Sequence, residues 1–182
     1  MMKKLLTTIS LALTLCLSLT TVFAAPSINK NGAVKKDSIL INGEKVDANT
    51  TAAFDSKKET YSAAGVSDET IDVIEKVNAN PSQLASLIKG VDLSGYSLLT
   101  EFQDLSVYVN GELKQKVKNV TLTWEVPNLV KTAKNVKVLH YSTERNTWEI
   151  LTPKSVDFDN KTITQEFKDL SPVAVILSSW WC

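Results

Sequence analysis

The chain has 182 residues, and its 20 basic side chains balance 20 acidic ones, so its formal net charge is zero at pH 7. Nucleic-acid-binding proteins need a concentrated basic face to displace counterions from phosphates, so this balance, without a Lys/Arg-rich block, argues against a nucleic-acid partner. The single histidine excludes a site built from several imidazoles, and the length allows one domain with a sizeable core.

Residues 1–24 have the three-part pattern of a secretory signal peptide. Lys3 and Lys4 form a charged start, an apolar stretch runs from about residue 5 to residue 19, and the segment ends in the small residue Ala24. We therefore predict secretion, with cleavage between Ala24 and Ala25. A retained membrane anchor is the alternative, because the stretch is of borderline length for spanning a bilayer.

Cleavage would change both the charge and the cysteine content. The 158 remaining residues carry 18 basic and 20 acidic side chains, a net charge of −2. Cys16 would be lost, and Leu15 before it is not the small residue that lipidation requires. Cys182 would then be the single cysteine, which excludes an intrachain disulfide. We expect its tail, residues 179–182, to fray or to form an intermolecular disulfide dimer, and the mature chain to have no membrane association.

The region before residue 96 is predicted to contain a leader, a hairpin and two helices. Residues 25–37 are polar and lack an apolar period, which predicts a flexible leader. In residues 38–95, Asn42-Gly43 can form the turn of a short hairpin. Ser67 can cap a first helix, and a second helix can begin at Asn80-Pro81 and end at Gly90. The stretch 47–64 has weak periodicity and indicates a loop that can hold one short element.

Residues 96–178 alternate between apolar and polar side chains with a period of two. Asn110-Gly111 provides a second hairpin signal, and Pro172 opens a final apolar strand. Short strands separated by turn signals are typical of an antiparallel sandwich whose two sheets share one core. The predicted fold class is therefore α+β: an antiparallel β-sandwich preceded by a helical pair and a short N-terminal hairpin. Whether the helical pair forms a separate domain stays open.

Residues 120–176 carry a set of positions that suggests a family. They are Pro127, Val138, His140, Tyr141, Trp148, Ile163, Leu170, Ser171, Pro172, Ala174 and Val175. This pattern resembles the C-terminal Ig-like β-sandwich modules of secreted and cell-surface proteins of Gram-positive bacteria, although Leu170 replaces the usual aromatic residue before Ser-Pro. The resemblance covers about a third of the chain. It implies an Ig-like sandwich and no particular activity.

Polar residues give little indication of catalysis. His140 would need a nucleophile and an orienting acid, but the adjacent Ser142 lacks a glycine-rich turn, so we expect a strand histidine that is hydrogen-bonded or solvated. Paired carboxylates are expected to be solvated; examples are Glu101 with Asp104 and Asp157 with Asp159. The stretch 157–160 indicates a turn, because it lacks the glycine of a calcium loop. We predict no catalytic residue, metal site or cofactor.

Aromatic residues on the strands provide the candidate binding positions. Trp124 and Trp148 fall on the apolar parity of their strands and are expected in the core. Tyr108 and Tyr141 fall on the opposite parity, which places them on an outer face. There they could stack on a sugar or a partner side chain, or lie beneath the helices.

These observations favour a secreted, non-enzymatic extracellular module for binding, adhesion or structure at a bacterial cell surface. Its expected partner is an extracellular protein or a glycan. The alternative is a small secreted glycan hydrolase that uses two carboxylates across a cleft.

Overall fold

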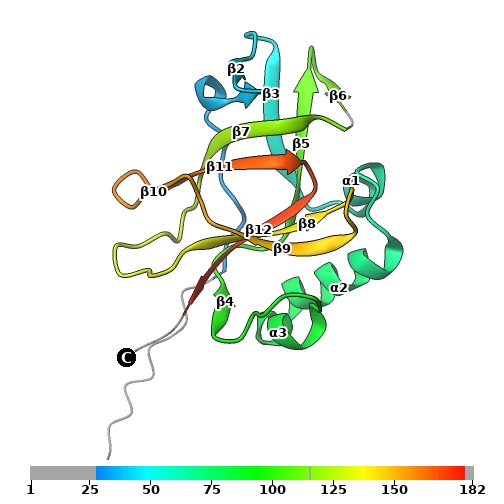
Figure 1. Ribbon diagram of the computed structural model, residues 1–182, viewed down its shortest axis with the longest axis vertical. Helices are drawn as coiled ribbons and strands as arrows, with labels where there is room; N and C mark the ends of the chain where they lie inside the picture. Colours follow the sequence, from blue (N-terminus) through cyan, green and yellow to red (C-terminus); the bar gives the residue numbers. More distant parts are fainter. Residues whose placement is uncertain (1–27, 115, 179–182) are drawn as a thin grey trace, which may run out of the picture.

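The computed structural model describes residues 28–114 and 116–178, and its strands form two antiparallel sheets (Figure 1). The first sheet has the order β10-β11-β7-β1-β2, with β1 (Leu40–Ile41), β2 (Glu44–Lys45), β7 (Lys118–Glu125), β10 (Ser155–Asp157) and β11 (Thr162–Asp169). The second has the order β3-β5-β12-β8-β9, with β3 (Thr50–Asp55), β5 (Gln103–Val109), β8 (Lys137–Ser142), β9 (Thr147–Leu151) and β12 (Pro172–Ser178). In addition, β4 (Tyr96–Leu98) pairs with β12, and β6 (Glu112–Lys114) pairs with β5.

One hydrophobic core lies between the two sheets. The first sheet contributes alternate side chains of β7 and β11, among them Trp124 and Phe167, and the second contributes Leu105, Val138 and Val175. Burial of each such side chain contributes about 1.5–3 kcal/mol to folding. Two antiparallel sheets that share a core are compatible with the predicted β-sandwich.

A second hydrophobic cluster joins the helices to the outer face of the second sheet. The helical elements are η1 (Lys36–Ser38), α1 (Lys58–Ala63), α2 (Asp68–Ala79), η2 (Pro81–Gln83) and α3 (Leu84–Leu87), of which α1, α2 and α3 lie together near β8 and β9 in Figure 1. The buried residues of α2 belong to the same cluster as Ala174 and Ile176 of β12. None of the helices in the described part of the chain is long and apolar enough to cross a bilayer.

Several local predictions are confirmed. Asn42 and Gly43 have φ values of 54° and 83°, and Asn110 and Gly111 have values of 54° and 80°. These left-handed conformations close the β1–β2 and β5–β6 hairpins, as a type I′ turn requires. The Ser67 hydroxyl accepts a hydrogen bond from the Thr70 amide and caps α2.

The second helix is shorter than predicted. Residues 81–83 form a 3-10 turn, and α3 adds only four residues before Ile88 becomes extended. The Asn80 side chain makes no capping bond to the backbone, because its oxygen accepts from the Ser82 hydroxyl instead.

The described part of the predicted leader, residues 28–37, is paired with the fold. The Gly32 amide donates to Glu125 O at 2.7 Å, and the Lys35 amide donates to Thr123 O at 2.8 Å. The Trp124 indole N–H also donates to the Asn31 side chain. The prediction missed this pairing because polar groups hold the segment, not an apolar period. The predicted signal peptide, with Ala24 and Ala25, and the Cys182 tail lie outside the described residues.

The region 38–95 shares both sheets with the region 96–178. β1 pairs with β7, and β3 pairs with β5 over six residues. The stretch predicted as a loop, 47–64, therefore contains a strand as well as α1. Because Phe54 packs on Trp124, this strand also contributes to the core between the sheets.

The fit of residues 28–37 against β7 generates a prediction at Gly32. A Cβ atom here would lie 2.7 Å from the Glu125 Cβ, so Gly32→Ala should push the segment off the strand. We expect a loss of about 1–3 kcal/mol in the free energy of unfolding, measured by urea denaturation. The exposed neighbour Lys30 is the control, and equal stability of Gly32→Ala and Lys30→Ala would contradict the prediction.

Candidate functional site

A buried polar network lies where the β8–β9 hairpin meets the corner between β11 and β12. The Asp169 carboxylate accepts from the Ser142 hydroxyl at 3.0 Å and from Arg145 Nη2 at 3.0 Å. The same guanidinium holds Glu149 through two bonds, of 2.7 Å from Nε and 2.9 Å from Nη2. Asp169 is almost fully buried and Glu149 is half-buried. Arg145 therefore bridges two carboxylates from neighbouring parts of the fold.

His140 extends this network beneath the hairpin. Its Nε2 lies 2.8 Å from the Ser171 hydroxyl oxygen, and its Nδ1 lies 3.6 Å from Glu149 Oε2, which is longer than a hydrogen bond. The hydrogen-bonded strand histidine is confirmed. Its partner Ser171 was missed as a candidate, because 31 residues separate the two in the sequence.

The hydrogen atoms of this network run in the opposite order to those of a catalytic triad. The Ser171 hydroxyl donates its hydrogen to the backbone oxygen of Tyr141. Nε2 of His140 must therefore carry a hydrogen and donate it to Ser171, which leaves Nδ1 as a bare acceptor. A triad needs the reverse, with Nε2 accepting the serine proton.

Burial controls the charge of His140. Desolvation lowers the pKa of the imidazole below 6.5, and the nearby Asp169 and Glu149 carboxylates oppose this effect only in part. His140 is therefore neutral at pH 7. The tautomer that the hydrogen bonds require is consistent with this state.

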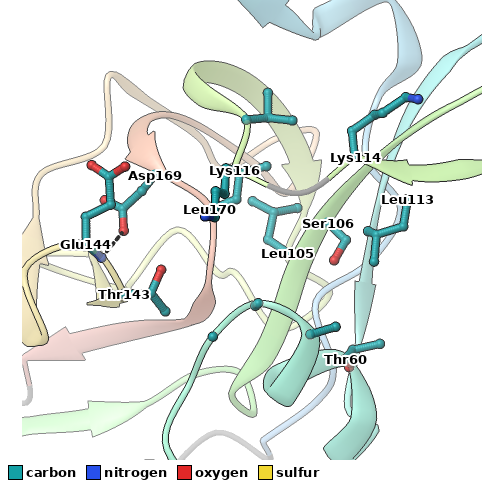
Figure 2. A pocket seen from close by; sticks show the side chains of 14 residues that line it. Thr60, Leu105, Ser106, Leu113, Lys114, Lys116, Thr143, Glu144, Asp169 and Leu170 are labelled. Carbon is teal, nitrogen blue, oxygen red and sulfur yellow. Dashed lines mark hydrogen bonds between the residues drawn. The ribbon is translucent and has the colours of Figure 1, made fainter.

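The network borders a pocket of about 130 Å³, and Asp169 is one of the residues that line it (Figure 2). Asp169, Glu144 and Thr143 lie together on one side, and Leu113, Lys114 and Ser106 lie on the other. The Glu144 amide donates to Asp169, and the Glu144 carboxylate pairs with Lys118. α1 and the residue that follows it supply another part of the wall through Thr60, Ala63 and Ala64.

The two predicted binding tyrosines occupy different surroundings. Tyr108 is half-buried and lies directly opposite Leu113 in the β5–β6 pair, so both side chains share the face that carries Ser106. Tyr141 is 7% exposed and lies in the cluster beneath the helices, against Trp148. The exposure that stacking on a ligand requires is thus absent at Tyr141.

Only one of the two tryptophans lies in the core between the sheets. Trp124 is fully buried there. Trp148 is half-buried on the opposite face of the second sheet, where it packs against Phe102 and Tyr141. The alternation along β9 did not show which face Trp148 occupies, because the second sheet buries apolar side chains on both faces.

The two predicted acidic pairs differ in their exposure to solvent. Asp157 is solvated and closes a turn. Its carboxylate accepts from the Asn160 side chain and from the backbone amides of Asn160 and Asp159, and these bonds lower its pKa. Asp104, by contrast, is fully buried, so its predicted solvation is wrong. Desolvation raises its pKa to about 6, with a smaller contribution from the charge of Asp55. One oxygen accepts from Ser106, and the other has no partner among the described residues. Within those residues, no group of three or more metal-ligating side chains is arranged to hold a metal ion.

Asp104→Asn should stabilise the protein at neutral pH. A folded-state pKa of about 6 lies above the ordinary aspartate value of 3.8, so the contribution of Asp104 to stability is full below pH 3.8 and is lost as the pH rises through 6. The amide removes the cost of a buried ionised carboxylate. We therefore expect the free energy of unfolding to rise by up to about 3 kcal/mol at pH 7 and to change little at pH 4. Asp157→Asn, whose carboxyl pKa is lowered, should have the opposite sign at pH 7. Urea unfolding of both variants at the two pH values checks this, and a destabilised Asp104→Asn at pH 7 would contradict it.

His140 should make stability fall on acidification. Its folded-state pKa is lowered, so its contribution is full above pH 6.5 and declines as the pH falls below that value. Asp104 makes the free energy of unfolding change with pH in the opposite direction. The effect of His140 is therefore measured in the Asp104→Asn variant. There we expect the free energy of unfolding to fall between pH 7 and 5, and to fall less after His140→Gln. An unchanged slope would refute the assignment.

The sequence matches no protein-family model, and neither the comparison with curated proteins nor that with solved structures finds a similar chain. The likeness of residues 120–176 to Gram-positive surface modules therefore stays a prediction.

Proposed function

We propose that this chain is a secreted, non-enzymatic module that binds a protein partner, for adhesion or structure, at a bacterial cell surface. In this proposal the fold is an α+β, Ig-like sandwich. The signal-peptide pattern of residues 1–24 supports export, and the resemblance of residues 120–176 to cell-surface modules supports the location. The two sheets with a shared core are compatible with such a module.

The observation that carries the proposal is an apolar surface at the mouth of the 130 Å³ pocket, which we call the β5–β6 surface. It consists of Tyr108, Leu113 and the pocket itself. Leu113 is 38% exposed and lines the pocket, and it is one of two large apolar side chains exposed in the described residues. Exposed apolar residues beside an aromatic ring are typical of protein-binding surfaces.

The size of the pocket favours a protein partner over a glycan. Pockets for small-molecule ligands usually enclose about 300–1,000 Å³, more than twice the volume available here. A single side chain of a partner protein fits such a volume better. Asp169 is held by Ser142 and Arg145 and so offers a fixed negative charge at the pocket wall.

The direction of the hydrogen bonds around His140 also supports a non-enzymatic role. Because Ser171 donates to a backbone carbonyl oxygen, its hydroxyl is not activated by the imidazole. The ring and the hydroxyl instead connect β8 to the start of β12.

The β5–β6 surface is tested by binding of the mature chain, residues 25–182, to intact Gram-positive cells. The chain carries Cys182→Ser, which excludes disulfide capture. We expect saturable binding that is lost when the cells are treated with trypsin, and about tenfold weaker binding after Leu113→Asp, which corresponds to ~1.4 kcal/mol. Val130→Asp is the matched control, because Val130 is the other exposed large apolar residue. Equal effects of the two variants would contradict the surface, and binding that survives trypsin would identify a glycan.

The hydrolase alternative draws on one observation, that Glu144 and Asp169 share a wall of the pocket. Both are already engaged, Glu144 by Lys118 and Asp169 by Ser142 and Arg145. In the same cell assay, release of reducing sugar that disappears after Glu144→Gln would replace the binding proposal by this alternative.

A further inference from the structure

β3 is the outermost strand of the second sheet, and only one of its two edges is paired. Among the described residues β3 pairs with β5 alone, while β6 and β12 pair with the opposite edge of β5. Along β3 the side chains of Thr51 and Ala53 are exposed, and those of Ala52 and Phe54 are half-buried against the core. η1 approaches β3 from the edge of the first sheet, but its hydrogen bonds run to β7. The second sheet can therefore take one further strand at β3.

One hydrogen bond beside β3 determines which of its backbone groups point outward. The Asn110 amide donates to Asn49 O at 3.0 Å, and these two residues continue the β3–β5 register by one pair beyond Thr50. Hydrogen-bonded and non-bonded pairs alternate in an antiparallel ladder, so Thr50 belongs to a non-bonded pair. The Thr50 amide agrees with this phase, because it donates to Asp47 O and not to β5.

The same alternation directs the backbone groups of Ala52 and Phe54 away from β5. Thr51, Ala53 and Asp55 are hydrogen-bonded to β5, so the N–H and C=O groups of Ala52 and Phe54 point to the outer edge. These groups have no hydrogen-bond partner in the described part of the chain. A row of such groups is a template for another extended backbone.

The other outermost strands carry features that oppose such pairing. β2 has two residues, Glu44 and Lys45, and both are charged, whereas β4, β6 and β10 have three residues each. β9 has a charged residue, Glu149, at its centre. Short strands and charged side chains are common means by which proteins protect sheet edges. β3 has six residues, and the stretch from Thr50 to Phe54 contains no charged residue, proline or glycine. Its edge therefore lacks this protection.

We propose that two copies of the chain associate through their β3 edges, antiparallel to each other, about a two-fold axis at Ala53. Thr50 is 4% exposed and its amide is already bonded, so the free part of β3 is 51–55, which is centred on Ala53. An axis at this residue pairs Ala52 of each copy with Phe54 of the other. Every outward N–H and C=O group of these two residues then gains a partner.

The charges of the strand are compatible with this axis. Asp55 of each copy lies opposite the uncharged Thr51 of the other, so like charges do not meet. The dimer joins the two second sheets into one continuous sheet. β6, with Leu113, lies beyond the opposite edge of β5. The β5–β6 surface therefore stays free, and the dimer does not depend on the partner proposed for that surface.

Sedimentation equilibrium of the mature chain, residues 25–182, measures the association. The chain carries Cys182→Ser, so that no terminal thiol can link two copies. We expect a reversible, concentration-dependent dimer. Ala53→Lys should weaken it about fivefold, because two positive charges then lie opposite each other. Ser155→Lys is the matched control, because Ser155 is an exposed residue of the β10 edge. A monomer at all concentrations, or equal effects of the two lysine variants, would overturn the proposal.

Single cysteines introduced into the same Cys182→Ser chain test the register. The two Ala53 residues form a non-bonded pair at the axis, with Cα atoms about 4.5 Å apart, which a disulfide can span. Oxidised glutathione should therefore convert the two thiols of an Ala53→Cys dimer into a disulfide and be reduced itself. Thr51→Cys is the control, because Thr51 is exposed on the same face but its two copies lie about 13 Å apart along the strands. The covalent dimer is measured by electrophoresis without reductant, and equal yields from the two variants would refute this strand pairing.

Discussion

Burial of both faces of β12 is the constraint on which the rest of the structure depends. Val173 and Val175 point into the core between the sheets, and Ala174 and Ile176 point into the cluster beneath the helices. β12 also pairs with β8 along one edge and with β4 and β5 along the other. A strand enclosed in this way cannot slip in register without moving apolar side chains from one core to the other. Its first residue, Pro172, therefore has a fixed position.

That fixed start positions the corner between β11 and β12. Asp169 ends β11 and Ser171 directly precedes β12, so their side chains are placed by two strands rather than by a loop. Asp169 is bound by Ser142 and lines the pocket of the β5–β6 surface, and Ser171 receives the Nε2 hydrogen of His140. The same corner thus orients a carboxylate on one side and an imidazole on the other.

The sequence predicted the local structure best where one or two residues decide it. Asn42-Gly43 and Asn110-Gly111 adopt the left-handed conformations of type I′ turns, and Ser67 caps its helix, because each depends on backbone geometry within a few residues. The pairing of residues 28–37 with β7 was missed, since it depends on backbone hydrogen bonds and on a Trp124–Asn31 contact across 93 residues. Such bonds leave no apolar period in the sequence.

The site was less predictable than the fold for the same reason. Strand parity placed Tyr108 and Tyr141 on one face, but only the packed helices determine that Tyr141 is covered and that Tyr108 stays half-buried. Parity likewise could not reveal that Asp104 is buried beside Ser106. The pairing of His140 with Ser171 joins two strands that are distant in sequence and neighbours in the sheet. Whether the imidazole can activate the serine depends on which acceptor receives the Ser171 hydroxyl hydrogen.

Arg145 links two carboxylates of the fold electrostatically. Its Nη2 lies 2.9 Å from Glu149 and 3.0 Å from Asp169, which lines the pocket. A guanidinium shared by two carboxylates holds each less firmly than it would hold one alone, so any change in the environment of Glu149 alters the charge balance around Asp169. Thermodynamic linkage makes this effect reciprocal. The carboxylates of Asp169 and Glu149 therefore cannot be understood separately, because the same side chain at the tip of the β8–β9 hairpin balances both.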